Sequence, residues 1–248
     1  MSSLIYAASV LDNNRNIKFI KYLILKGANV NEKDNCDKSV LMCVISRLTV
    51  NSYKIIKFLI KKGANINDKN IYDDTILMCV ANNIGKIDNP IKLVKYLIKE
   101  GVKINYKNKH NETALNVFCD NINTFSNNYI IKDIIKLLIN NGADVNIKNN
   151  CGETQFINLI SRVSEHSDFK LVKLFISKGA NVNFQNNKGV TALMMLSSTL
   201  NCRSIQYNLV KLLLDNKADV YIKNIEGKNI LKIIENNPKI SEYLFFDI

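Results

Sequence analysis

A five-residue signature recurs along the whole chain and constrains its fold more than any other feature. Its six copies read GANVN, GANIN, GVKIN, GADVN, GANVN and KADVY, and they start at Gly27, Gly63, Gly101, Gly142, Gly179 and Lys217. A small capping residue stands twelve positions after each start: Ser39, Thr75, Thr113, Thr154, Thr191 and Asn229. Self-similarity at a fixed internal distance is typical of repeat architectures, in which each unit contacts only its neighbours.

Each copy predicts a loop, an inner helix, a turn and an outer helix. In the second copy, Gly63 suits the end of a helix, Asn70 an Asx-type turn and Thr75 an N-cap. The third, fourth, seventh and eighth residues before every signature are apolar, which predicts the buried face of an outer helix. Leu4 to Ser9 reads as a first inner helix.

The repeats predict one all-α domain over residues 1–248. It is expected to be a solenoid of about seven helix-turn-helix units with β-hairpin loops. The expected units are residues 1–26, 27–62, 63–100, 101–141, 142–178, 179–216 and 217–248.

The chain is basic, with a formal net charge of +12, but only four of its 34 basic residues are arginine. Abundant lysine, asparagine and isoleucine are what an AT-rich genome encodes. One lysine ladder lies six residues after the signature starts (Lys33, Lys69, Lys107, Lys148 and Lys223), and another six residues before them (Lys21, Lys57, Lys95, Lys136, Lys173 and Lys211). Because a dedicated nucleic-acid surface favours arginine, we do not expect specific nucleic-acid binding.

The sequence contains no catalytic or metal-binding pattern. None of the six cysteines forms a CxxC pair, and only two histidines could complete a metal site. Cys43 and Cys79 share a core position in adjacent repeats, whereas Cys36 and Cys151 share a hairpin-tip position too far apart for a disulfide. No apolar run approaches a membrane span, and the N-terminus lacks signal-peptide features. We expect reduced thiols, a cytoplasmic location, no cofactor and no enzyme activity.

The repeat closely resembles the ankyrin repeat, whose consensus runs G-A-D-V-N-x-K-D-x-x-G-x-T-P-L-H-x-A-A and ends in an outer helix like I-V-K-L-L-L. The segments KLLINNGADVNIKNNCGET (Lys136 to Thr154) and KLFISKGANVNFQNNKGVTALM (Lys173 to Met194) match it with high specificity. The resemblance covers essentially the whole chain. It implies a right-handed stack of helix pairs, β-hairpins at right angles to them and a concave binding face.

Three departures from the ankyrin pattern affect local structure. The TPLH tetrapeptide becomes SVLM, TILM, TALN, TQFI, TALM and NILK, so we expect the implied threonine–histidine hydrogen bonds to be missing and replaced by methionine or isoleucine packing. The glycine of the first three hairpins becomes Asp37, Asp73 and Asn111, residues that tolerate a positive φ. The spacing exceeds the family's 33 residues, and the longest insertion spans Asp120 to Asn128.

The resemblance places partner binding at the hairpin tips and at the start of the inner helices. Ile71 and Tyr72 form an apolar pair at one tip, and exposed aromatic residues are enriched at interaction hot spots. With repeats at helix-packing distance, this tip and the next one are expected about 10 Å apart. The predicted partner-binding residues are Ile71, Tyr72, Asp74, Lys109, His110, Glu112, Asn150 and Glu153.

Two further apolar segments are candidate contact sites. Phe125 in the longest insertion is the one residue there that could bind a partner, although drift explains such an insertion as well. Leu244 and Phe245 in the C-terminal YLFF, Tyr243 to Phe246, fall at core positions. We therefore expect YLFF to seal the last repeat.

The sequence as a whole predicts a monomeric scaffold that binds another protein. Its composition and repeats are similar to those of ankyrin proteins from large DNA viruses or intracellular parasites, which address host proteins, so a host protein is the expected class of partner. Two alternatives stay open. The first is electrostatic nucleic-acid binding through the lysine ladders. The second is a ubiquitin-ligase substrate adaptor, although no obvious F-box-like segment ends the chain.

Overall fold

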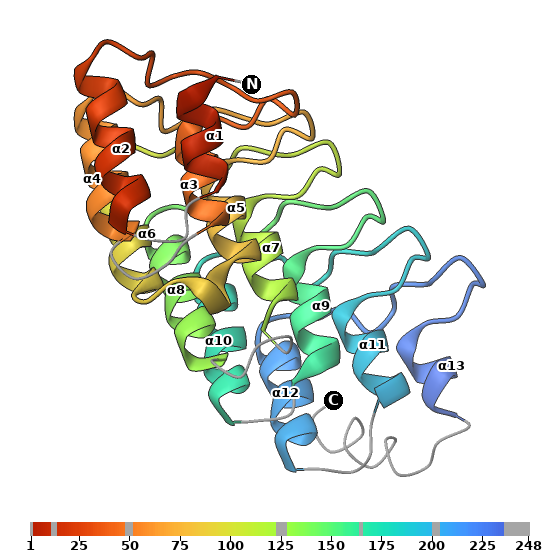
Figure 1. The fold of residues 1–248 in the computed structure, drawn as a ribbon. Helices are drawn as coiled ribbons and strands as arrows, with labels where there is room; N and C mark the ends of the chain where they lie inside the picture. The colour runs from red at the N-terminus through yellow and green to blue at the C-terminus, as the bar shows by residue number, and fades with distance from the viewer. Residues whose placement is uncertain are drawn as a thin grey trace. The chain divides into compact units, whose positions relative to one another are not determined.

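The chain folds into two compact units, Met1–Ala143 and Asp144–Ile248, each a stack of helix pairs (Figure 1). This computed structural model describes residues 2–10, 14–47, 52–122, 128–163, 166–199 and 204–235. Within these ranges it holds thirteen α-helices, one 3-10 helix and no β-strand. None of these helices is long and apolar enough to cross a lipid bilayer. The all-α fold class is confirmed.

The first unit contains helix pairs in which a short inner helix precedes a longer outer helix. The inner helices are α1 (Ser3–Ser9), α3 (Val40–Ser46), α5 (Ile76–Asn82) and α7 (Ala114–Asp120). The outer helices are α2 (Asn14–Leu25), α4 (Ser52–Lys61), α6 (Pro90–Lys99) and α8 (Asn128–Asn140), and the 3-10 helix η1 (Ile84–Lys86) precedes α6. Consecutive inner helices pack on one another, and each also packs on its own outer helix.

The second unit repeats this arrangement. Its helices are α9 (Gln155–Arg162), α10 (His166–Ser177), α11 (Ala192–Thr199), α12 (Ser204–Asp215) and α13 (Ile230–Ile234). The inner helices α9, α11 and α13 pack in that order, and the outer helix α10 packs on α12. The described ranges thus hold six inner–outer helix pairs and a seventh inner helix, α13, in agreement with a repeat solenoid. The single domain over residues 1–248 and its unit boundaries stay predictions.

The helix ends follow the predicted capping pattern. The side-chain oxygens of Ser39, Thr154, Thr191 and Asn229 each accept a hydrogen bond, at 3.0–3.4 Å, from the backbone N–H three residues later. At the end of α4, Gly63 has a φ of 89°, and its N–H donates to the carbonyl of Ile60 at 3.0 Å. Both kinds of bond satisfy backbone groups that a helix end leaves without intrahelical partners.

The expected loss of polar bonds at the histidine position is wrong in one repeat. Asn116 occupies this position in TALN, and its Oδ1 accepts hydrogen bonds from the Thr113 backbone N–H at 2.9 Å and the Thr113 hydroxyl at 2.6 Å. An amide oxygen has two lone pairs and can accept both bonds. The inner helix α7 therefore keeps a buried polar pair in place of apolar packing.

Every hairpin tip is closed by one side-chain oxygen. The Oδ1 atoms of Asp34, Asn70, Asn108, Asn149, Asn186 and Asn224 each accept two backbone N–H groups, from the residues two and four positions later, at 2.8–3.0 Å. The Asx-type turn predicted at Asn70 is confirmed and recurs in all six hairpins. Asp37, Asp73 and Asn111 have positive φ values of 56°, 61° and 59°, which confirms that these turns survive without glycine.

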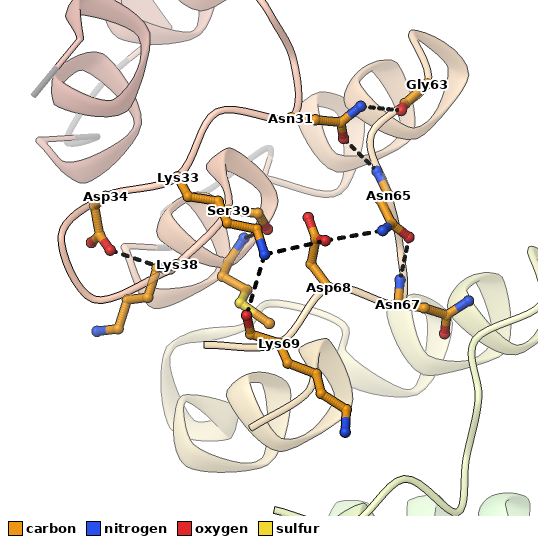
Figure 2. Close-up of polar contacts among 11 residues, drawn as sticks. Asn31, Lys33, Asp34, Lys38, Ser39, Gly63, Asn65, Asn67, Asp68 and Lys69 are labelled. Carbon is orange, nitrogen blue, oxygen red and sulfur yellow. Dashed lines mark hydrogen bonds and ion pairs between the residues drawn. The ribbon is translucent and has the colours of Figure 1, made fainter. Parts of the chain in front are cut away.

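The last asparagine of the signature links consecutive hairpins, a role that the sequence analysis did not assign. Asn31 donates from Nδ2 to the Gly63 carbonyl at 3.0 Å and accepts the Asn65 backbone N–H on Oδ1 at 2.8 Å (Figure 2). The same two bonds to the next hairpin recur at Asn67 in the first unit and at Asn146 and Asn183 in the second. One side chain thus satisfies two backbone groups of the following repeat.

Candidate functional site

Within each unit the hairpin tips are hydrogen-bonded directly to one another. In the first unit, the Ile71 N–H donates to the Cys36 carbonyl and the Lys109 N–H to the Tyr72 carbonyl, both at 3.0 Å. In the second unit, the tip residues Asn187 and Ile225 donate in the same way at 3.2 Å to the carbonyls of Cys151 and Lys188. The expected separation of about 10 Å between the Tyr72 and Lys109 tips is therefore wrong, because tips approach more closely than packed helices.

The predicted apolar anchor of the first unit is available at the surface. The Tyr72 side chain is 54% exposed although its backbone N–H and carbonyl are both hydrogen-bonded. Ile71 beside it is half-buried, and Lys109 and His110 on the following tip are exposed. A fixed backbone with an exposed aromatic side chain suits an interaction anchor, because little conformational entropy remains to be lost on binding.

Two predicted acidic contact residues also hold the first unit's hairpins together. Nδ2 of Asn108 lies 3.1 Å from Asp74 Oδ1 and 3.1 Å from Glu112 Oε2. Nδ2 of Asn70 lies 3.2 Å from the other oxygen of Asp74. Asn108 is 7% exposed, whereas Asp74 and Glu112 are half-buried, so the network is partly shielded from water. Substituting Asp74 or Glu112 would therefore disturb the hairpins as well as any contact with a partner.

The second unit contains a hollow of about 680 Å³ between its hairpins and inner helices. Val190, Met194, Met195 and Ile233 supply its apolar lining, and polar lining comes from the hairpin residues Asn150, Glu153, Asn187 and Lys188. An apolar cavity with a few polar groups at its edge is the usual form of a ligand-binding site. Two of the predicted partner-binding residues, Asn150 and Glu153, line it.

The sequence analysis missed the apolar residues of this hollow. Met195 and Ile233 lie four residues after their capping residues, and in α3 and α5 the same position holds the buried Cys43 and Cys79. The cysteines suggested a core position throughout the array. In the second unit, however, Met195 and Ile233 are only half-buried. The large apolar residues at this position of the last two inner helices were the available signal.

Several lysines of the hairpin ladder contact the next hairpin. The Lys33 ammonium lies 3.5 Å from Asp68 Oδ1 and 3.5 Å from the Lys69 carbonyl oxygen (Figure 2). The Lys69 ammonium lies 4.5 Å from the centre of the Tyr106 ring. In the second unit, Lys148 donates to the Gln185 carbonyl at 3.2 Å. These ammonium groups stabilise the hairpin stack, which gives the ladder a structural role without nucleic acid.

The outer-helix ladder makes similar contacts within the chain. Lys136 forms an ion pair of 2.9 Å with Asp133, one turn away on α8. The ammonium groups of Lys21 and Lys173 lie 5.6 Å and 4.9 Å from the ring centres of Phe58 and Phe169. Exposed pairs of this kind contribute little stability, but they spread the positive charge along the outer helices.

The cysteines fall into a buried group and an exposed group. Burial, reinforced by nearby Asp34, raises the pKa of the Cys43 thiol to about 11. Burial, reinforced by Asp74, raises the pKa of Cys79 to about 12. Both thiols are therefore protonated and inert as nucleophiles at neutral pH, and their predicted core placement is confirmed. Cys36 and Cys151 are exposed free thiols.

The described ranges contain no cluster of three or more histidine, cysteine, aspartate or glutamate side chains that could hold a metal ion. Three sequence-based expectations fall outside these ranges: the contact proposed for Phe125, the sealing role of Tyr243 to Phe246, and the thiol of Cys202.

The sequence matches a family model described as "Ankyrin repeats (3 copies)" over residues 4–108 and 124–224. None of the curated proteins matches the chain significantly.

Solved structures share the fold at low sequence identity. The ankyrin repeat domain of Bcl-3, a member of the IkappaB protein family, is 19% identical, with a TM-score of 0.69 over 94% of this chain and 93% of that chain. An ankyrin repeat domain from Acinetobacter baumannii is 22% identical, with a TM-score of 0.69 over 87% of this chain and 98% of that one. The human ASB11 ankyrin repeat domain is 17% identical, with a TM-score of 0.65 over 100% and 98% of the two chains.

Proposed function

The chain belongs to the ankyrin-repeat family, and from this premise we propose that it binds a protein partner through its hairpin tips and inner helices. Ankyrin repeats are in general protein–protein interaction modules without catalytic activity. The hollow in the second unit carries the proposal, because it lies between hairpins and inner helices, where the family resemblance places partner contacts.

The lining of the hollow indicates what kind of partner surface would fit. Methionine side chains are flexible and polarisable, so Met194 and Met195 can adapt to apolar side chains of different shapes. Glu153 and Lys188 bring opposite charges to the polar lining, which suits a partner segment with polar groups beside its apolar residues. An apolar centre with a polar edge is also the usual composition of a protein interface.

Tyr72 in the first unit is proposed as a second anchor. Its side chain is 54% exposed, with Ile71 beside it and the cationic Lys109 on the next tip. Tyrosine is enriched among interface residues that contribute most of the binding energy. The full proposed set stays Ile71, Tyr72, Asp74, Lys109, His110, Glu112, Asn150 and Glu153. We add Met195 and Ile233 to it because they line the hollow.

The proposal keeps protein binding ahead of nucleic-acid binding. The lysines are spread over hairpins and outer helices, and several of their ammonium groups contact carbonyls, carboxylates or aromatic rings of the same unit. Diffuse phosphate contacts give weak, salt-dependent affinity, on the order of 10⁻⁴–10⁻⁶ M. A host-cell partner, a cytoplasmic location and the absence of catalysis are further parts of the proposal, supported by composition and family resemblance.

The proposal is tested by affinity capture with the immobilised chain from a lysate of the candidate host, followed by mass spectrometry. The captured partner is then titrated against three variants. Met195→Asp and Tyr72→Ala should each weaken binding by about 1–2 kcal/mol, roughly ten-fold. Tyr221→Ala is the matched control, because Tyr221 is a 67% exposed aromatic residue that does not line the hollow.

Circular dichroism melting verifies that the three variants are folded. If Met195→Asp and Tyr72→Ala both bind the partner as tightly as the unsubstituted chain, the proposed surface is wrong. If nuclease treatment of the lysate abolishes capture of the partner, the result favours the nucleic-acid alternative.

A further inference from the structure

The first outer helix, α2, exposes apolar residues at positions that every later outer helix buries. Phe19 lies eight residues before its signature and is 47% exposed. The equivalent residues Ile55, Leu93, Ile134, Leu171 and Leu209 are at most 1% exposed. Leu23 shows the same contrast, since it is half-buried whereas Leu59, Leu97, Leu138, Phe175 and Leu213 are 0% exposed. This side of α2 therefore lacks the cover that the equivalent side of later outer helices has.

Contacts within the first unit show what lies beside a neighbouring position on this side in two later repeats. The residue five positions before the signature is Phe58 in α4 and Tyr96 in α6. The Lys21 ammonium of α2 lies 5.6 Å from the Phe58 ring centre, and the Tyr53 ring of α4 lies 5.6 Å from the Tyr96 ring. In both cases the covering group comes from the preceding outer helix. Tyr22, the equivalent residue in α2, is 55% exposed.

Phe19, Tyr22, Leu23 and Lys26 form a single stripe on α2, which we name the α2 stripe. Counted from Phe19, the other three follow after three, four and seven residues, which places all four on one helical face. The Lys26 ammonium lies 5.8 Å from the Tyr22 ring centre. An amphipathic helix laid along such a stripe would bury its apolar residues in the way that one outer helix buries the next.

The charge around the α2 stripe indicates the chemistry of its occupant. Lys18 and Lys26 are exposed, and the segments 3–10 and 14–26, which hold α1 and α2, contain no acidic residue. Two copies of this surface would bring like charges together, which opposes a symmetric contact. A helix with acidic residues beside its apolar stripe would complement the lysines.

We propose that the α2 stripe is a second binding surface, which takes an acidic amphipathic helix of a partner protein. This surface is separate from the hollow and from the Tyr72 tip, so it goes beyond the proposed function. The repeat stack would continue onto the partner helix, because the partner would take the place that a preceding outer helix takes in later repeats.

The test uses two synthetic helical peptides with leucine at positions i, i+3, i+4 and i+7. One carries glutamate beside the leucines, and the other carries lysine at the same places. Each is titrated into the full chain by fluorescence anisotropy. The glutamate peptide should bind about ten-fold more tightly than the lysine peptide, and its advantage should shrink as salt is added.

Matched variants assign the binding to the α2 stripe. Phe19→Ala with Tyr22→Ala should weaken binding of the glutamate peptide about ten-fold. Tyr129→Ala on α8, where the tyrosine is 67% exposed, should leave it unchanged. Lys18→Glu with Lys26→Glu should reverse the preference between the two peptides. This charge reversal leaves the apolar residues in place, so it decides the question even if the double alanine variant does not fold.

Three results would overturn the proposal. The first is equal affinity for both peptides, including the absence of binding by either. The second is an unchanged preference after charge reversal. The third is a concentration-dependent dimer in analytical ultracentrifugation that the charge-conserving Tyr22→Ala variant abolishes, because the α2 stripe would then bind a second copy of the chain.

Discussion

The hairpins of the first unit turn on residues with side chains, whereas those of the second unit turn on glycine. Asp37, Asp73 and Asn111 have φ values of 56–61°, and the equivalent Gly152, Gly189 and Gly227 have φ values of 70–71°. The backbone turn is therefore nearly the same in both units. The tip-to-tip backbone hydrogen bonds are also alike, at 3.0 Å in the first unit and 3.2 Å in the second. What differs is which side chains surround the turn.

In the second unit, a side chain at two of the turns would meet the next hairpin, its backbone at Gly189 and mainly the Asn187 side chain at Gly152. A Cβ atom at Gly189 would lie 2.8 Å from the Cα of Asn224, and one at Gly152 would lie 2.1 Å from Asn187 Oδ1. The first unit also joins two hairpins through Asn108, which donates to the carboxylates of Asp74 and Glu112. Both units thus bring the backbones of neighbouring tips together, and the first unit adds a charged hydrogen-bond network to this contact.

The largest effect is expected for Gly189→Ala. The substitution combines a strained positive φ with a clash against the backbone of the next hairpin, so it should cost about 2–4 kcal/mol of unfolding free energy. Gly227→Ala is the matched control, since its φ is 71° but nothing lies within 4 Å of the added Cβ. Strain alone should cost about 1–2 kcal/mol there. Urea unfolding measures both, and equal losses would show that close approach contributes nothing.

A smaller effect is expected from the network of the first unit. Asn108→Ala removes two bonds to backbone N–H groups and two to carboxylates, whereas Asn186→Ala in the second unit removes the same two backbone bonds. Because hydrogen bonds to charged groups are stronger, Asn108→Ala should cost more than Asn186→Ala by about 1.5–3 kcal/mol. Urea unfolding of the two variants measures both losses. Equal losses of stability would contradict the stabilising role of the network.

The smallest effect is an alkaline instability that comes from two buried thiols of the first unit. Its inner helices bury Cys43 and Cys79, with pKa values raised from 9.0 to about 11 and about 12, where the second unit has Met195 and Ile233. Above pH 9 the unfolded chain releases thiol protons that the folded chain keeps, so stability falls as pH rises towards the folded pKa. Each thiol contributes a slope of at most about 1.4 kcal/mol per pH unit.

Cys79→Val tests this dependence, because valine is a similarly small apolar residue without a titratable group. Between pH 9 and pH 11, its unfolding free energy should fall less steeply than that of the unsubstituted chain, by about 1 kcal/mol per pH unit. Met195→Leu is the control in the second unit and should leave the slope unchanged. If the unfolding free energies of Cys79→Val and of the unsubstituted chain fall equally steeply with pH, the predicted contribution of the Cys79 thiol is wrong.

Local features were predictable from the sequence because short-range interactions create them. The N-caps at Ser39 and Thr154, the glycine ending α4 and the Asx turn at Asn70 depend on residues within four positions of one another. The prediction failed at Asn116, where the family comparison suggested apolar packing but an amide can accept the bonds of Thr113. An amide in the histidine position can accept hydrogen bonds that methionine or isoleucine cannot, so the residue type itself indicated the exception.

The candidate site was only partly predictable, because exposure depends on neighbouring repeats. The sequence placed Tyr72 at a tip, and its exposed side chain agrees with that placement. It also placed Asp74 and Glu112 there, but not Asn108 between them. The hollow lined by Met195 and Ile233 could not be predicted, because it depends on the distance between repeats. A repeating sequence pattern does not specify that distance.

The sequence by itself determined the repeat, the order of the helices, the caps and the family, because each follows from residue types at fixed spacing. Only the tertiary structure decided which of these residues remain at the surface. Phe19 and Leu209 occupy the same position of the repeat, yet one is 47% exposed and the other is 0% exposed. The physical reason is that burial in a stacked array comes from the neighbouring repeat, so chemically equivalent positions differ wherever that neighbour differs.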